Sequence, residues 1–168
     1  MAEIDYSSHP IPIIYLTPEG YQALQTELEQ LTGPKRSEIA SRIRECLSKG
    51  EYGEDHSEID EVRFEQSIVE KRITELRRIF SVAQVISPSD IPKDTASIGS
   101  YVQVKDQERG SEFEIRLVAS IEADPDRDLV SCESPMGNAL LGAKIGDTVS
   151  FEAPAGVIRY QITSIRSL

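Results

Sequence analysis

The segment from Glu51 to Glu61 holds the residues of this chain with the clearest capacity for chemistry. It reads EYGEDHSEIDE and carries no lysine or arginine. Its six carboxylates repel one another, which costs stability unless something compensates them. Carboxylate oxygens are the ligands that Mg²⁺ prefers, usually one or two of them completed by water or a substrate. The segment therefore predicts half of a cation site that a partner completes. The six are Glu51, Glu54, Asp55, Glu58, Asp60 and Glu61.

A solvated turn is the simpler interpretation of the same segment. Asp55 and Glu58 would then stabilise the positive end of a helix that begins nearby. That interpretation leaves Glu51 and Glu54 unexplained, because they precede the helix start. A protruding pair of carboxylates suits phosphoryl chemistry, in which a metal ion activates the attacking water and stabilises the leaving oxygen. His56 is either a further ligand or an exposed residue at the helix start.

The residues before this segment predict one long helical arm. Thr17-Pro18-Glu19 is a typical helix start, with a capping hydroxyl, a first-turn proline and a favourable charge. The spacing of the apolar positions that follow is 3 or 4, as in a coiled-coil seam. The seam then skips eight residues, one more than a heptad, across Gly33-Pro34. We expect a kink or a local break there. The seam positions are Tyr21, Leu24, Leu28, Leu31, Ile39, Ile43 and Cys46.

A second arm follows the acidic segment and shows the most regular pattern in the chain. Its spacings alternate between 3 and 4 over eight positions, of which only Gln66 is polar. Two such seams joined by a short glycine-containing link predict an antiparallel coiled-coil hairpin with the acidic segment at its far tip. At about 1.5 Å per residue, arms of about 30 residues reach on the order of 45 Å. The seam positions are Ile59, Val62, Gln66, Val69, Ile73, Leu76, Phe80 and Ala83.

Basic residues are spread along the first arm, below the acidic tip. They form either an ordinary solvated helix face or a track that contacts a nucleic-acid backbone. The sequence leaves both interpretations open. The residues are Lys35, Arg36, Arg42, Arg44 and Lys49.

The pattern changes to a period of two after a proline-rich linker, which predicts a small β-rich domain. Five short antiparallel strands are expected around Val102, Phe113, Val130, Val149 and Tyr160. One short helix is expected at 138–141. The α+β organisation is therefore a flexible segment at 1–16, the hairpin at 17–86 with its acidic tip at 51–61, a linker at 87–95 and the β domain at 96–168.

Composition excludes several classes of protein. The formal net charge of −11 argues against a general nucleic-acid binder, which would carry a basic surface. The chain has no long apolar run for a membrane span and no signal-peptide pattern at its start, so we expect a cytoplasmic protein. Cys46 and Cys132 are expected to be two reduced thiols, since they are far apart and form no C-x-x-C pair.

Three stretches of the sequence resemble the bacterial Gre transcript-cleavage factors, the GreA/GreB family, and are closer to the GreA type. The first is Leu16-Thr17-Pro18-Glu19-Gly20-Tyr21, and the second is Gly50-Glu51-Tyr52-Gly53-Glu54-Asp55. The third combines Ser134-Pro135, Ala139-Leu140-Leu141-Gly142, Gly146-Asp147 and Pro154-Ala155-Gly156. The resemblance extends from Tyr15 to the C-terminus.

The resemblance implies a mechanism. It implies that the hairpin enters the secondary channel of RNA polymerase, where Glu51 and Glu54 help to hold Mg²⁺ at the polymerase active centre. The polymerase then hydrolyses the backtracked RNA 3′ end and resumes elongation. Mg²⁺ would be supplied at the polymerase and not bound tightly by the isolated chain, which would be a monomeric stimulator and not itself an enzyme.

The resemblance also assigns supporting roles. Tyr52, Asp55 and Glu58 would support the tip, and the five first-arm cations would contact the RNA. The C-terminal domain would be FKBP-like, and a loop at 133–135 would dock on the polymerase rim through Glu133, Ser134 and Pro135.

Two positions depart from the family pattern and keep alternatives open. Glu51 stands where the family usually has Asp, and Asp55 stands where it usually has Asn. A carboxylate displaced by about 1 Å can lose on the order of 100-fold in rate. The alternative is therefore a channel-binding regulator or inhibitor with little cleavage activity. A third possibility, a prolyl isomerase, depends only on the FKBP-like resemblance and has few aromatic residues to support it: Tyr101, Phe113, Phe151 and Tyr160.

Overall fold

The computed structural model describes residues 13–49 and 57–167 and divides the chain into two compact units. One unit is Gln22–Val82. The other combines Met1–Tyr21 with Ala83–Leu168. This division differs from the expected one, because the residues just before and just after the hairpin belong with the β-rich unit. Of the flexible segment predicted at 1–16, residues 1–12 lie outside the described residues, while Ile14–Leu16 forms a strand, so the prediction was wrong there. Of the tip predicted at 51–61, residues 51–56 lie outside the described residues.

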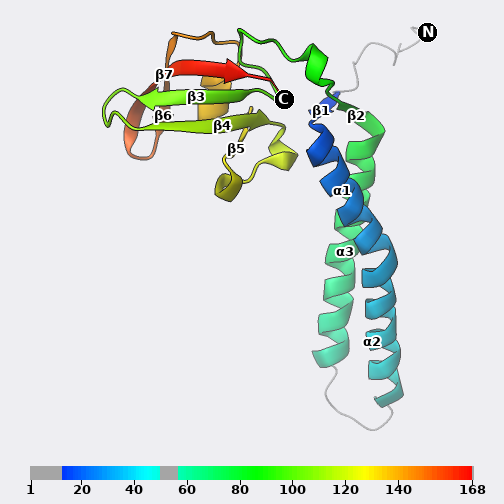
Figure 1. The fold of residues 1–168 in the computed structure, drawn as a ribbon. Coiled ribbons are helices and arrows are strands. Elements are labelled where there is room, and N and C mark those ends of the chain that lie inside the picture. The colour runs from blue at the N-terminus through cyan, green and yellow to red at the C-terminus, as the bar shows by residue number, and fades with distance from the viewer. Residues whose placement is uncertain (1–12, 50–56, 168) are drawn as a thin grey trace, which may run out of the picture. The chain divides into compact units, whose positions relative to one another are not determined.

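The first unit holds the expected helical hairpin except the first residues of α1, 18–21, which belong to the other unit (Figure 1). One arm consists of α1 (Pro18–Gln30), a π-helical turn (Leu31–Lys35) and α2 (Arg36–Lys49), and the other arm is α3 (Ser57–Val82). None of the helices in the described ranges combines the length and the apolar content of a membrane span.

The two arms pack through the predicted seam. Ile39 of α2 and Val62, Val69 and Ile73 of α3 form a buried cluster, with Leu28, Leu31, Ile43 and Cys46 packed against it. The seam prediction was wrong at three positions of the second arm. Gln66 is exposed, Ile79 is buried where Phe80 was expected, and Ala83 lies in a strand. At Gln66 an apolar contact is replaced by polar contacts between the arms, described below.

The π-helical turn accounts for the irregular spacing of the first seam. It contains Gly33 and Pro34, the residues at which a break was predicted. A π turn holds about one residue more than an α turn. The extra residue between Leu31 and Ile39 is therefore absorbed locally, and the seam resumes on the same face.

The start of α1 shows the capping that the sequence predicts. Thr17 Oγ1 accepts a hydrogen bond from the Gly20 N–H at 3.0 Å, and Pro18 is the first helical residue. The Thr17 N–H itself donates to the Glu122 carboxylate at 3.2 Å. Before this cap, β1 (Ile14–Leu16) pairs in parallel with β2 (Ala83–Val85). The sequence did not predict this pairing, because strands of three residues are too short to show an alternating pattern.

The second unit contains the expected five-stranded sheet, in the order β5-β4-β3-β7-β6 (Figure 1). The strands are β3 (Tyr101–Asp106), β4 (Glu112–Val118), β5 (Leu129–Ser131), β6 (Thr148–Ala153) and β7 (Gly156–Arg166). The expectation of an all-antiparallel sheet was wrong for one pair, because β5 runs parallel to β4. Residues 119–128 lie between these strands and carry the chain back, so that both strands run in the same direction.

One face of the sheet carries the core of this unit. Alternate residues of β3 and β4, such as Val102, Val104, Ile115 and Leu117, are buried there together with Leu140. Leu140 is the last residue of helix α4 (Pro135–Leu140), which begins three residues earlier than the predicted 138–141. The earlier start follows from Ser134, whose side chain caps this helix by accepting from the Gly137 N–H.

Gly137 should tolerate no side chain. A Cβ added there would lie 1.9 Å from the Ser131 carbonyl oxygen, a backbone atom that cannot turn away. We expect Gly137→Ala to lower the free energy of unfolding by about 1–3 kcal/mol, measured by urea titration. Gly33→Ala is the matched control. Its Cβ would meet nothing within 4 Å, so equal destabilisation of both variants would contradict the assignment.

Candidate functional site

The predicted metal-binding carboxylates lie outside the described residues. Glu51 and Glu54 fall in the link between α2 and α3, as do the predicted supporting residues Tyr52 and Asp55. Glu58 is described and lies exposed in the first turn of α3. The roles assigned to these residues therefore stay predictions.

The described ends of both arms lie at the same end of the hairpin. The first arm ends at Lys49 and α3 begins at Ser57 (Figure 1). Glu58 and Asp60 stand in the first turn of α3, where the helix dipole favours negative charge. Within residues 13–49 and 57–167, no three His, Cys, Asp or Glu side chains come together as a metal site.

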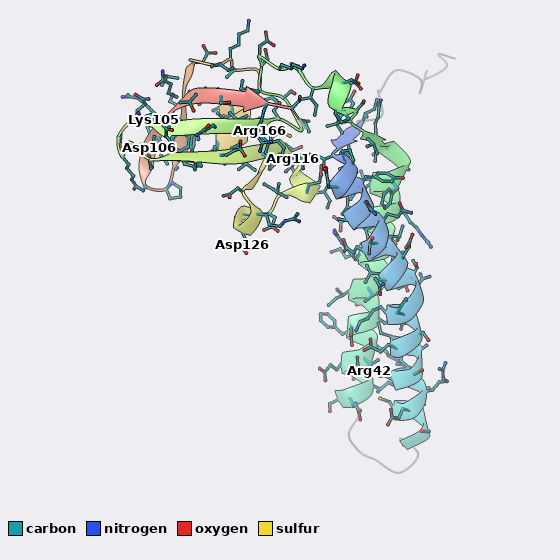
Figure 2. The ribbon with its side chains drawn as sticks, viewed as in Figure 1. Arg42, Lys105, Asp106, Arg116, Asp126 and Arg166 are labelled. Carbon is teal, nitrogen blue, oxygen red and sulfur yellow. The ribbon has the colours of Figure 1, made fainter. Side chains whose placement is uncertain are left out.

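Three of the five predicted RNA-contacting cations pair with carboxylates of the opposite arm. Arg36 binds Glu70 through two hydrogen bonds, Nε to Oε1 at 2.7 Å and Nη2 to Oε2 at 2.5 Å. Lys35 Nζ lies 2.7 Å from Glu65 Oε1, and Arg42, labelled in Figure 2, also binds Glu65. These pairs join the first arm to α3, Lys35 from the π-helical turn and Arg36 and Arg42 from α2.

The electrostatic effect of the pairs appears in the pKa values of the carboxyls. Hydrogen bonds from Lys35 and then Arg42 lower the pKa of Glu65. The hydrogen bonds from Arg36 likewise lower the pKa of Glu70. The lowered pKa values follow from the pairs, in which both glutamates are charged.

The remaining two cations differ from these three. Arg44 Nη2 donates to the Ser41 hydroxyl at 3.0 Å, and no carboxylate pairs with Arg44 in the described part of the chain. The side chain of Lys49 lies outside the described residues. Whether any of the five contacts RNA stays a prediction, and Arg44 carries its charge on an exposed side chain.

Sequence reasoning missed Glu65 and Glu70 as partners of the basic arm. A signal was available, because antiparallel arms joined near residue 53 bring positions 36 and 70 to the same level. Treating the charged residues of each arm as separate solvated faces concealed the complementarity between them.

The predicted docking residues lie where a turn leads into a helix: Glu133 and Ser134 are in the turn, and Pro135 begins α4. Ser134 Oγ accepts from the Gly137 N–H at 3.0 Å and donates to the Ser131 carbonyl at 2.7 Å. Pro135 is the first residue of α4 and is exposed. Glu133 is also exposed, and its carboxylate accepts from the Ser120 hydroxyl at 2.6 Å. All three residues are thus held in a fixed arrangement at the surface of the β-rich unit.

The aromatic residues of this unit contact one another and nearby arginines. Phe113 and Phe151 make edge contacts with Tyr160, at centroid distances of 5.3 and 5.4 Å. Tyr101 lies against Arg116 and Arg166, labelled on the sheet in Figure 2, at 4.9 and 3.9 Å from its centroid. These contacts involve all four aromatic residues on which a prolyl-isomerase pocket would depend, and that activity stays an untested alternative.

Two family models together match most of the chain. The model described as "Transcription elongation factor, N-terminal" matches residues 14–85. The model described as "Transcription elongation factor, GreA/GreB, C-term" matches residues 91–167.

Individual relatives match over nearly the same length. The transcription elongation factor GreA of Acetivibrio thermocellus is 47% identical over 153 residues, which cover 91% of this chain and 96% of that protein. The GreA of Thermoanaerobacter pseudethanolicus is 45% identical over 155 residues, covering 92% and 98%. A crystal structure of the GreA factor homolog 1 of Thermus thermophilus is 26% identical, covers 93% of this chain and 100% of that one, and has a TM-score of 0.43.

The Glu65 pairs predict a dependence of hairpin stability on pH. Because the folded-state pKa of Glu65 is lowered, its contribution is present above the unfolded pKa of about 4.3 and is lost as the pH falls through the folded value. We expect Glu65→Gln to lower the thermal midpoint at pH 7, measured by circular dichroism at 222 nm. Near pH 3 the variant and the original protein should converge.

Glu29→Gln is the matched control for this experiment. Glu29 lies exposed on α1 and accepts from the Gln25 side chain. Its replacement should leave the midpoint almost unchanged at both pH values. A Glu65→Gln midpoint that equals the original at pH 7 would contradict a stabilising role for the pairs.

Proposed function

Because this chain belongs to the GreA/GreB family of transcription elongation factors, we propose that it acts on bacterial RNA polymerase and stimulates cleavage of backtracked RNA. The hairpin enters the secondary channel of the polymerase with its acidic end first. The polymerase cleaves the RNA 3′ end with its own Mg²⁺-dependent activity and then resumes elongation. The chain is a stimulator and not itself an enzyme, and it works as a monomer in the cytoplasm.

The observation that carries this proposal is the family match over both units, joined to a hairpin that ends in an acidic link. A hairpin of two helices exposes a long narrow arm with a small end, which suits insertion into a channel. Its two arms are held in register by a buried cluster and by the pairs of Glu65 and Glu70.

Glu51 and Glu54 would supply the carboxylates that bind the metal ion. Their carboxylates are suitable ligands for Mg²⁺, which needs further oxygen ligands that the polymerase and water provide. Bound between the two proteins, Mg²⁺ would lower the pKa of a water molecule and so generate the nucleophile. Glu51 and Glu54 would orient that water towards the RNA backbone, with Tyr52, Asp55 and Glu58 supporting the tip.

The described charges refine the proposed RNA contact. Lys35, Arg36 and Arg42 are already paired with Glu65 and Glu70. Breaking those pairs to reach RNA would weaken the hairpin. We therefore assign the contact chiefly to Arg44 and Lys49, which lie nearest to the acidic end of the first arm.

The second unit would dock on the rim of the channel through Glu133, Ser134 and Pro135. Glu133 and Pro135 are exposed, and Ser134 fixes the backbone between them. The alternative of a regulator with little cleavage activity is not favoured, because the relatives at 47% and 45% identity are transcription elongation factors.

The carboxylate pair gives a direct test. We expect Glu51→Ala or Glu54→Ala to abolish cleavage of RNA in backtracked polymerase complexes, while binding to the polymerase changes by less than about 3-fold, or about 0.7 kcal/mol. Glu61→Ala is the control for charge alone, and it should retain most of the activity. RNA cleavage by both tip variants at the original rate would contradict the proposed mechanism.

Pro135→Ala tests the docking surface. We expect its dissociation constant for RNA polymerase to rise by about 10-fold, corresponding to about 1.4 kcal/mol, with cleavage at saturation unchanged. Pro154→Ala, which alters an exposed turn proline elsewhere in the same unit, should bind like the original protein. Equal affinities for both variants would remove Pro135 from the interface.

A further inference from the structure

A carboxylate from a distant part of the chain holds the residue that caps α1. The Thr17 N–H donates to Glu122 Oε2 at 3.2 Å, and the Thr17 hydroxyl donates to Glu122 Oε1. Glu122 stands 105 residues further along the chain, at the end of a 3₁₀-helical turn (Ser120–Glu122). Thr17 is buried, and its Oγ1 also accepts the Gly20 N–H. The cap of α1 therefore depends on a contact with the β-rich unit.

Gly20 leaves the space that the Glu122 carboxylate occupies. A Cβ added at Gly20 would lie 1.7 Å from Glu122 Oε1 and 2.3 Å from the carboxyl carbon. The carboxyl group is the end of a flexible side chain and can turn away, but it then loses both hydrogen bonds from Thr17. Any larger residue at position 20 therefore competes with the hold on the cap.

The backbone gives no other reason for a glycine at this position. Gly20 lies inside α1 and is not one of the glycines with a positive φ angle. Alanine is more favourable than glycine inside a helix. The close approach of the Glu122 carboxylate is thus what favours glycine at position 20.

A second polar contact holds the same helical turn. Arg116 Nη2, whose residue is labelled in Figure 2, lies 3.1 Å from Glu19 Oε2. The Arg116 side chain is only 8% exposed, so β4 and its neighbours fix its position. Glu19 follows Thr17 by two residues, and the turn is therefore held at two points. All of these residues belong to the unit that combines Met1–Tyr21 with Ala83–Leu168.

The helix that begins in this turn continues into the hairpin. Residues 18–21 of α1 belong to the β-rich unit, and residues 22–30 belong to the hairpin. Two binding surfaces on one chain bind a common partner more tightly when their connection restrains them than when it leaves them loose. A hold on the first turn of α1 supplies such a restraint.

We propose that Glu122 is a positioning residue that locks the first turn of α1 to the β-rich unit, with Gly20 leaving room for its carboxylate. The lock restrains the hairpin and the docking residues 133–135 so that both engage the polymerase in one binding event. Its effect on polymerase binding rests on the proposed function, whereas the lock itself does not.

The lock is tested first in the protein alone, by hydrogen exchange followed by NMR. We expect Glu122→Ala to speed exchange of the Thr17 and Gly20 amides by about 10-fold or more, because the hydrogen bonds of the cap are lost or weakened. Exchange of the Ile73 amide in α3 should be unchanged. Unchanged exchange at Thr17, or equal acceleration at Ile73, would overturn the lock.

Gly20→Ala tests whether the two residues act through one contact. In the original protein it should lower the thermal midpoint, because the added methyl group displaces the carboxylate. In the Glu122→Ala background it should raise the midpoint, because alanine favours the helix. A shift of the same sign in both backgrounds would overturn the assignment. Gly33→Ala is the matched control, since its Cβ would meet nothing within 4 Å, and its effect should be equal in both backgrounds.

Binding to RNA polymerase tests the positioning role. Glu122→Ala and Gly20→Ala should each raise the dissociation constant by about 10-fold. The rate of RNA cleavage at saturating protein should change by less than twofold. The double variant should bind like either single variant, because both remove the same contact. Affinities equal to that of the original protein, or losses that multiply in the double variant, would overturn the positioning role.

Glu152→Ala is the matched control for loss of a carboxylate. Glu152 is exposed on β6 of the same unit, and its replacement should leave the dissociation constant unchanged. If the original protein binds the polymerase but stimulates no cleavage, the proposed function fails. The exchange and binding comparisons then still decide the role of Glu122.

Discussion

Two helices that pack only against each other can bury only the stripe along which they touch, and this constraint governs the hairpin. The stripe holds few fully buried residues, among them Ile39, Val62 and Ile73. Every other face must either be polar or be covered by something else. The ion pairs between the arms are one response to this constraint, whereas Phe64 and Ile68 of α3 remain exposed.

The ion pairs contribute specificity of register more than binding energy. Exposed pairs are screened by water and salt, so a single one stabilises little. Here Glu65 is shared by Lys35 and Arg42, while Arg36 and Glu70 meet in a two-point contact. A shift of one arm along the other by a single turn would separate these partners. The register of the arms thus depends on charge where the apolar seam is interrupted at Gln66.

The sequence predicted the parts of the structure that repeat and missed those that do not. The 3-and-4 spacing located both arms, and Gly33-Pro34 located the irregular turn. The period of two located all five strands of the larger sheet, but it carries no direction, so the parallel placement of β5 beside β4 was not predictable from it. Ion pairs between the arms depend on three-dimensional register, which no single segment encodes.

The candidate site, too, was predictable from the sequence only in part. Residue type and crowding of charge made Glu51 and Glu54 candidates, because like charges without compensation are informative by themselves. Their role stays a prediction, since both lie outside the described residues. The sequence did not single out Phe64 and Ile68, because they do not belong to the seam. A residue outside the repeating pattern becomes informative only when its exposure is known.

The π-helical turn at Leu31–Lys35 has a consequence for the angular phase of the arm. Each residue of an α-helix rotates the chain by about 100° about the helix axis. Without the wider turn, the additional residue would rotate everything beyond Lys35 by that angle, turning Ile39 and Ile43 away from α3. The turn resets this phase, so the distal arm presents the same side to its neighbour as the proximal arm does.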